Sequence, residues 1–266
     1  MLAVVPIVEG TGDTNATRSL ILRYLRGRSI ATDAISAKGR GNITRKGGLE
    51  RLLSLASTIK PPYEASRKAI LVLLDADDEP CAGTFALNLA ERAQKCRLPH
   101  PVAIVVANRM FESWVIGSFE EMVRYGVCTV CKTVTIPDDV ESIHKPKQWL
   151  EVTMSEPPYV PEIHQESFSM FIDFNLVKQR CRSFRRFCKT LDELLTMTNP
   201  PRGHVLPSHK SIGESSLLAK VEELPVTEVQ EAHIQSTDLS KQSESDNKIA
   251  ERRDHTFKTR PLVRKQ

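Results

Sequence analysis

Acidic side chains follow two apolar segments of the chain, at the points where each segment ends. Residues 2–8 (LAVVPIV) run directly into Glu9, and residues 69–74 (AILVLL) run into Asp75 and Asp77. Each apolar segment predicts a buried β-strand. Ligands of an open parallel sheet bind beyond the carboxyl ends of its strands. If the two strands are neighbours, these three carboxylates converge on one spot.

Carboxylates held this close repel one another, and the repulsion raises their pKa values. A hard divalent cation removes that penalty, and Mg²⁺ prefers oxygen ligands. Gly10 and Gly12, which follow Glu9, let the backbone turn sharply and present amide groups to a phosphate. An acidic turn after one strand, taken alone, is more often solvated than metal-binding. The position of Glu9 at the end of a second strand favours a metal site.

Strand-like and helix-like segments alternate through residues 1–120, and several of the strands are apolar on both faces. This pattern predicts an α/β domain with a mostly parallel sheet flanked by helices. Residues 121–202 predict a helical and irregular extension packed on that core, with a clear apolar stripe between Phe184 and Leu195. Residues 203–266 are rich in Ser, Glu, Lys and Gln and predict a disordered tail.

The composition is that of a globular protein. The chain has 266 residues, of which 40% are hydrophobic and 26% charged, with a formal net charge of +4. Its longest apolar runs are too short to span a bilayer, so no membrane association is expected. Six scattered cysteines favour free thiols in a reducing cytoplasm. The pair Cys128 and Cys131 has the C-x-x-C spacing, but no second pair lies at zinc-finger distance, which disfavours a zinc site.

The order of motifs along residues 3 to about 198 resembles a Toprim-like bacterial family known as domain of unknown function DUF4276. The segments that carry this likeness are VEGTGD, KGRGNI, LLDADDEPC, VVANRMFESW, KPKQWL and RSFRRF. A strand ending in Glu-Gly, followed by a strand ending in Asp-x-Asp, also resembles the Toprim domains of topoisomerases, primases and OLD (overcoming-lysogenization-defect) family nucleases. The resemblance implies a Toprim-like, Rossmann-like fold and metal-dependent phosphodiester chemistry.

The resemblance also implies roles for individual acidic residues. Glu9 matches the Toprim glutamate, which binds metal and acts as general acid or base. Asp75 and Asp77 match the Asp-x-Asp metal ligands, and Asp13 matches a second acidic residue of the OLD-type nucleases. Glu112 follows the fourth predicted strand and would serve a second metal ion. The expected cofactor is Mg²⁺ or Mn²⁺.

Basic residues are the expected substrate contacts. Lys145 or Lys147 would neutralise the transition-state phosphate, and the sequence does not choose between them. A basic glycine loop near residue 40 and an acid-free basic segment at residues 178–189 suit a phosphate backbone, although an ordinary charged helix face explains the second equally well. Glu112 also has a purely structural explanation, an ion pair with Arg109 on a helix surface. The predicted nucleic-acid contacts are Lys38, Arg40, Arg182, Arg185 and Arg186.

These observations predict a Mg²⁺-dependent nuclease acting on DNA or RNA. The resemblance further implies the effector of an anti-phage defence system. It would work with a separate ATPase, since the chain has no ATPase motif of its own. The alternative is a non-catalytic Toprim-like module that binds metal or a partner. A topoisomerase- or primase-like role is disfavoured because those enzymes need further domains.

Overall fold

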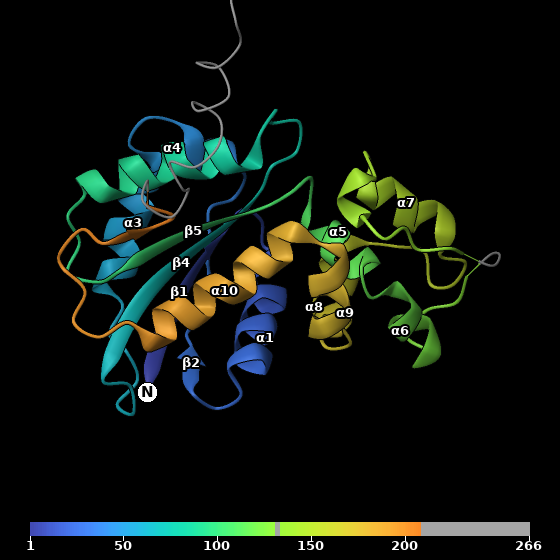
Figure 1. Ribbon diagram of the computed structural model, residues 1–266, viewed down its shortest axis with the longest axis horizontal. Coiled ribbons are helices and arrows are strands. Elements are labelled where there is room, and N and C mark those ends of the chain that lie inside the picture. Colours follow the sequence, from blue (N-terminus) through green and yellow to red (C-terminus); the bar gives the residue numbers. More distant parts are fainter. Residues whose placement is uncertain (131–133, 209–266) are drawn as a thin grey trace, which may run out of the picture. The chain divides into compact units, whose positions relative to one another are not determined.

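A parallel β-sheet forms the centre of the structure, a computed structural model that describes residues 1–130 and 134–208 (Figure 1). Six strands take part within these residues, in the order β2-β1-β4-β5-β6, and β3 also pairs with β1. Every pairing in the sheet is parallel. The strands are β1 (Leu2–Val8), β2 (Ser29–Ala31), β3 (Ile35–Ser36), β4 (Arg67–Asp75), β5 (Val102–Ala107) and β6 (Val205–Leu206).

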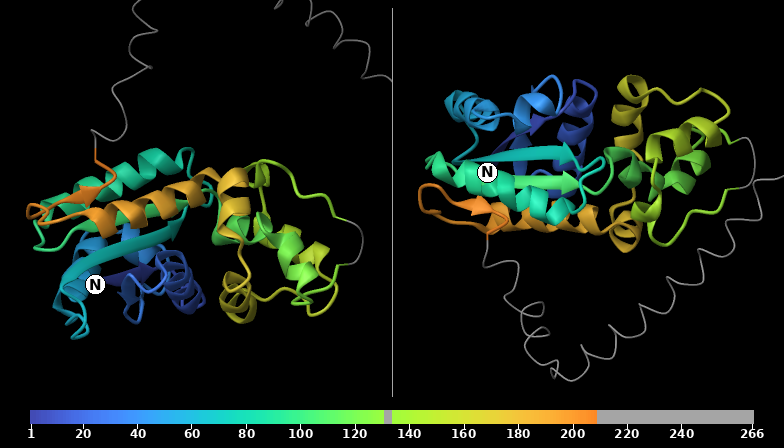
Figure 2. Two further views of the ribbon diagram at one scale, coloured as in Figure 1. Left: turned by 60° about the horizontal axis from the view of Figure 1, so that its bottom comes forward. Right: turned by 90° about the horizontal axis from the view of Figure 1, so that it is seen from above.

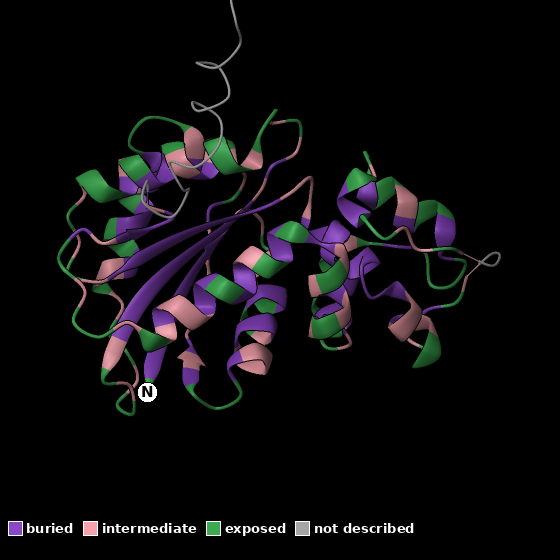
Figure 3. Cartoon of the chain, in the orientation of Figure 1, coloured by how far each residue is buried: buried purple, intermediate pink, exposed green. Residues whose placement is uncertain are grey.

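Helices cover both faces of the sheet. Helices α1 (Asp13–Leu25) and α10 (Arg182–Thr196) lie on one face, and α3 (Gly48–Thr58) and α4 (Ala82–Lys95) on the other, with short α2 (Gly41–Thr44) ahead of α3 (Figure 1). Successive strand residues point to opposite faces, so a strand covered on both sides is apolar throughout. In β4, Leu71 packs in the α1 and α10 layer, whereas Ile70 and Val72 pack in the α3 and α4 layer. Figure 3 shows the resulting fully buried strands.

A group of short helices lies beyond the carboxyl ends of the strands. In Figure 2 the arrows of β4 and β5 point toward this group. Proline at the first turn starts two of its helices, α7 and α8, where the missing N–H costs nothing. The group comprises α5 (Phe111–Ile116), α6 (Phe119–Arg124), the 3₁₀ helix η1 (Val140–Ser142), α7 (Pro146–Thr153), α8 (Pro161–Ser169) and α9 (Phe174–Arg180).

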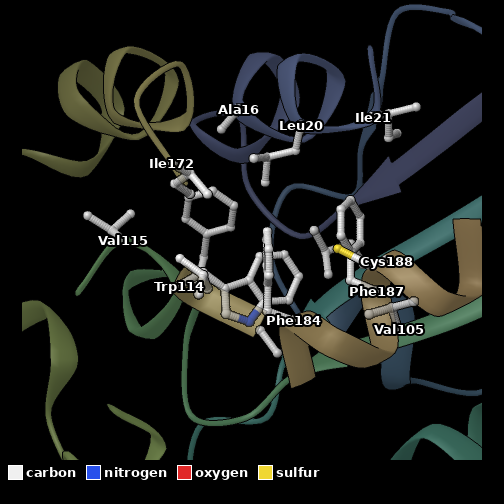
Figure 4. Packing of buried hydrophobic residues seen from close by; sticks show 14 of the residues in the cluster. Ala16, Leu20, Ile21, Val105, Trp114, Val115, Ile172, Phe184, Phe187 and Cys188 are labelled. Carbon is white, nitrogen blue, oxygen red and sulfur yellow. The ribbon is translucent and has the colours of Figure 1, made fainter. Parts of the chain in front are cut away.

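An aromatic cluster joins the group to the sheet layer (Figure 4). The ring of Trp114 in α5 lies 5.2 Å from the rings of both Phe184 and Phe187 in α10, centroid to centroid. Its indole N–H donates to Ser183 Oγ at 2.8 Å, so the buried polar atom of the indole is satisfied. The position of α5 at the sheet edge is therefore fixed by α10.

The predicted parallel sheet flanked by helices is confirmed. The sheet takes one strand, β6, from residues predicted to begin the tail, because Val205 and Leu206 pair with Val102 and Ala103. The predicted disorder otherwise concerns residues 209–266, which lie outside the described residues, as does Cys131 of the C-x-x-C pair. Among the described helices, none combines the length and apolarity needed to cross a membrane.

Candidate metal and phosphate site

The carboxyl ends of β1, β4 and β5 meet at one edge of the sheet. Val8 of β1 is level with Leu73 of β4, so Glu9 and Asp75 begin their loops side by side. Asp75 is in turn level with Ala107, the last residue of β5. The predicted neighbourhood of the two acidic motifs follows directly from this register.

The five predicted metal ligands form one electrostatic group, which we call the acidic cluster: Glu9, Asp13, Asp75, Asp77 and Glu112. Burial raises the pKa of Asp75 well above its ordinary value, and the charges of the other four members raise it further. Burial also raises the pKa of Glu9, with added repulsion from Asp77 and Asp13. Charge repulsion of this kind is the property that a bound cation relieves.

Two members of the acidic cluster share a polar partner that the sequence did not indicate. Gln165 of α8 hydrogen-bonds to Asp13, and its amide nitrogen also lies 3.4 Å from Glu112 Oε1. Tyr159 donates to the same Glu112 oxygen at 2.9 Å. Asp13 Oδ2 also accepts the N–H of Gly10 at 2.9 Å. Burial is the largest influence on both carboxyls and raises the pKa of each.

The backbone around the Asp-x-Asp motif is held by the end of β5. The N–H of Phe111 donates to Asp75 Oδ1 at 2.9 Å, and the N–H of Asp77 donates to the Arg109 carbonyl at 2.7 Å. Asp77 and Arg109 both adopt positive φ, at 49° and 64°. Non-glycine residues are uncommon in this left-handed region, which is enriched at functional sites.

Arg40 lies against the acidic cluster. Its guanidinium donates to Asp77 Oδ2 at 3.0 Å and to the Ala76 carbonyl at 3.2 Å, and it pairs with Glu79. The same group lies over the Phe85 ring, 4.8 Å from its centroid. Arg40 therefore neutralises one side of the cluster, and its predicted contact with nucleic acid stays a prediction.

The donor set of the acidic cluster fits a hard divalent cation. Two of its buried oxygens, Glu9 Oε2 and Glu112 Oε2, lack a hydrogen-bond partner among the residues that the structure describes. Yet within residues 1–130 and 134–208 no three His, Cys, Asp or Glu side chains are arranged to hold one ion. Mg²⁺ commonly uses only one or two carboxylates and takes its remaining ligands from water and substrate phosphate. On this comparison, the carboxylates of the cluster could supply one or two ligands to such an ion, and water or a phosphate would have to supply the others.

A cavity of about 650 Å³, which we call the α7 cavity, opens beside the acidic cluster. Asp77 and Asp78 line it from the sheet edge, and both predicted catalytic lysines, Lys145 and Lys147, line it from the start of α7. The lining therefore mixes both signs of charge: Arg40 and Arg109 accompany the two aspartates, and Glu151 accompanies the two lysines. The remaining lining residues are Arg40, Arg109, Met110, His144, Gln148 and Glu151.

The other predicted nucleic-acid contacts are not among the residues that line the α7 cavity. Lys38, Arg182 and Arg185 are exposed, and Arg186 is half-buried. Arg185 donates to the carbonyls of Lys178 and Gln179 at 2.6 and 3.2 Å. The structure thus separates the basic face of α10 from the cavity.

A second buried carboxylate, Glu141 of η1, supports the same sheet edge. It accepts the N–H of Ser183 at 2.7 Å and the amide of Asn108 at 3.3 Å, and Cys181 Sγ lies 3.1 Å away. Glu141 therefore ties the end of β5 to the start of α10. Among these residues, Asn108 is the one whose place at the sheet edge the sequence could indicate, since it directly follows an apolar strand.

Comparison with known proteins gives one match. The model of a domain of unknown function, DUF4276, matches residues 8–192, a span that includes the whole acidic cluster and both lysines of the α7 cavity. No curated protein and no solved structure matches the chain.

Proposed function

Given that the chain belongs to the DUF4276 family, whose function is unknown, we propose from the geometry of the sheet edge that it is a Mg²⁺- or Mn²⁺-dependent nuclease. One observation supports this proposal: four carboxylates raise the pKa of buried Asp75 at the sheet edge, and one of them, Asp77, lines a cavity that Lys145 and Lys147 also line. Such an edge repels a phosphate until a cation joins it, so metal and substrate bind together. The substrate class is the phosphodiester backbone of DNA or RNA.

The positions of the residues assign them different roles in the proposed reaction. Asp75 and Asp77, with Glu9 beside them, would hold the cation, which when bound stabilises the charge that develops on the phosphate. Lys145 and Lys147 hold phosphate oxygens from the facing wall and place the bond over the acidic cluster. Glu9 has a raised pKa, and its Oε2 has no hydrogen-bond partner in residues 1–130 and 134–208, so it is the group suited to accept a proton from the attacking water.

Cleavage assays test the proposal directly. Purified protein is incubated with plasmid, single-stranded DNA and RNA in Mg²⁺, Mn²⁺ or EDTA, beside Asp75→Asn and the exposed control Glu64→Gln. We expect metal-dependent cleavage that Asp75→Asn lowers by about 100-fold or more and Glu64→Gln leaves unchanged. Cleavage that persists in EDTA or in Asp75→Asn contradicts the proposal.

A non-catalytic module is the second candidate, and a specific observation favours it. Arg40 already neutralises Asp77, and the described residues contain no ready set of three ligands. This reading predicts metal or partner binding without cleavage, even when a cognate ATPase is present.

The proposal also includes a partner protein, a biological role and a cellular location. A separate ATPase and a role in anti-phage defence rest on the likeness to OLD-type Toprim proteins. A cytoplasmic location is supported by the cysteines, since the five that the structure describes are all free thiols.

A further inference from the structure

A second cavity, of about 460 Å³, lies at the opposite end of α1 from the acidic cluster. Asp13 begins α1 and Arg26 directly follows it, so a helix about 20 Å long separates the two places. We call it the α1 cavity. Its walls come from the last turn of α1, the turn that leads to β2 at the bottom of Figure 1, and the start of α9.

The lining of the α1 cavity is strongly basic. Among the described residues its one carboxylate is Asp173, whose Oδ1 caps α9 by accepting the N–H groups of Asn175 and Leu176 at 2.8 and 3.0 Å. Four cationic side chains face this single carboxylate, so the lining has a net charge of +3. The cations are Arg23, Arg26, Arg28 and Lys178.

One of the four cations is structural. Arg23 donates to the carbonyls of Ser169 and Ile172, the second at 2.9 Å, and lies 5.1 Å from the centre of the Phe174 ring. Its role is to hold α1 against the segment between α8 and α9. The charge of Arg23 still contributes to the potential of the cavity.

The other three cations, Arg26, Arg28 and Lys178, keep N–H groups that are not used in hydrogen bonds within the described residues. Arg28 uses its Nε to reach the Leu25 carbonyl at 3.1 Å, and Lys178 Nζ lies 6.0 Å from the centre of the Tyr24 ring. Across the described parts of the chain, no salt bridge includes Arg26, Arg28 or Lys178. Beyond the lining, the Tyr24 contacts indicate Asp192 as a nearby carboxylate, which accepts the Tyr24 hydroxyl at 2.6 Å and forms no close ion pair with any of the three.

Helix capping explains only part of this arrangement. Cations at the carboxyl end of a helix are favourable, which accounts for Arg26 and Arg28 as surface residues. It does not account for Lys178, which comes from α9, or for the hollow that the three side chains surround. A volume of about 460 Å³ lies within the usual range for small-molecule sites and exceeds what one free phosphate fills.

We propose that the α1 cavity binds a phosphate-bearing ligand, either a free nucleotide or a segment of a nucleic-acid strand. Arginine forks and a lysine provide the donors that phosphate oxygens require, and Tyr24 and Phe174 add aromatic surface beside them. The proposal does not depend on the acidic cluster, since no residue is shared between the two sites.

The test is calorimetric titration of the full chain in EDTA, which keeps the acidic cluster free of metal. The probes are pyrophosphate, adenosine diphosphate and a single-stranded 12-mer of DNA. We expect Arg28→Ala with Lys178→Ala to weaken binding by about 10-fold or more. The matched control Arg51→Ala with Lys60→Ala removes the same charge from exposed positions around α3 and is expected to bind as wild type does.

The binding results distinguish the two ligand classes and test the proposal itself. Binding of pyrophosphate or the nucleotide identifies a small phosphorylated ligand, and binding of the 12-mer alone identifies a nucleic-acid strand. Failure of wild type to bind any probe, or equal losses in the two double variants, overturns the proposal. Arg28→Gln, at an exposed position, provides a variant with little risk to folding. Asp75→Asn is expected to bind normally here, which keeps this result separate from that of the nuclease assay.

Discussion

Tyr159 donates a hydrogen bond of 2.9 Å to Glu112 Oε1, while Glu112 Oε2 lacks a partner within the described part of the chain. The two residues lie 47 positions apart in the chain and are only 5% and 2% exposed. A carboxylate buried this deeply depends on its few donors, so this contact sets how well the folded state tolerates a charged Glu112.

Removing the phenol is therefore expected to destabilise the fold. Tyr159→Phe should lower the free energy of unfolding by about 1–3 kcal/mol at neutral pH, because Glu112 Oε1 then retains only Gln165. Urea denaturation measures the change. Tyr63→Phe is the matched control, since that ring is wholly exposed. Equal unfolding midpoints for the two variants would show that the Tyr159 hydroxyl contributes nothing.

The acidic cluster predicts that stability falls as pH rises. Burial raises the pKa values of Glu9, Asp13, Asp75 and Glu112, so the folded state holds protons more tightly than the unfolded state. The stabilisation is present below the ordinary carboxyl range and is lost as pH rises through the raised values. Metal-free protein should melt at a higher temperature near pH 5 than near pH 8, as measured by calorimetry.

Two substitutions test which carboxyls cause this dependence of the melting temperature on pH. Asp75→Asn keeps an oxygen acceptor for the Phe111 N–H and should raise the melting temperature at pH 8 by about 2–4 °C, the equivalent of about 1 kcal/mol. Glu50→Gln should change the melting temperature at pH 8 in the opposite direction, downward. The Arg92 hydrogen bond lowers the Glu50 pKa, so the stabilisation from Glu50 is present at pH 8 and is lost as pH falls. A wild-type profile unchanged by Asp75→Asn would place the pH dependence elsewhere.

Divalent cations should stabilise the folded chain. At a concentration about 100 times the dissociation constant, a single bound ion adds about 2.7 kcal/mol to the free energy of unfolding. We expect Mg²⁺ or Mn²⁺ to raise the melting temperature of wild type and Glu64→Gln, but not of Asp75→Asn or Glu9→Gln. Sodium chloride at matched ionic strength is the control, and an equal rise with that salt would argue against a specific site.

Two glycines in helices should respond to alanine in opposite ways. A Cβ at Gly48, the first residue of α3, would lie 2.2 Å from the backbone carbonyl oxygen of Asn42, whereas at Gly83 in α4 it meets only Cys81 Sγ at 3.8 Å. Gly48→Ala should cost about 1–3 kcal/mol despite better helix propensity, and Gly83→Ala should gain about 0.5–1 kcal/mol. Thermal melts separate the two cases, and stabilisation by both changes would refute the close approach.

The lysines of the α7 cavity can be told apart by salt dependence. Each phosphate contact contributes about 0.7 to the slope of log affinity against log salt for a single strand. Lys145→Ala and Lys147→Ala should each lower that slope by this amount if both contact phosphate, as measured by fluorescence anisotropy in Mg²⁺ with a cleavage-resistant phosphorothioate strand. Lys60→Ala is exposed and remote, and an equal effect there would indicate general charge attraction only.

The sheet and the acidic cluster were predictable because their signals are local. Strands buried on both faces are apolar throughout, and parallel strands bring Glu9 and Asp75 to the same edge. Gln165 and Tyr159 follow no strand and reach the cluster only because α8 packs on α1 and α5. Strand β6 has two residues, too few for a pattern.

Arg40 shows why charge alone did not predict placement. Its basic glycine loop, which predicts contact with nucleic acid, folds back over the end of β1, where the Gly39 N–H donates to the Glu9 carbonyl at 2.9 Å. That turn directs the guanidinium onto Asp77. The sequence records the charge of the loop but not the direction in which it folds.

Strand β4 is hydrogen-bonded on both sides, to β1 through Leu73 and to β5 as far as Asp75. Amide hydrogens in such a central strand exchange with solvent only when most of the domain opens. The acidic side of the α7 cavity lies at the end of this rigid strand, whereas both lysines of the other side are exposed, Lys147 within the eight-residue helix α7 and Lys145 directly before it. Any tightening around a ligand therefore requires α7 to move toward a fixed sheet edge.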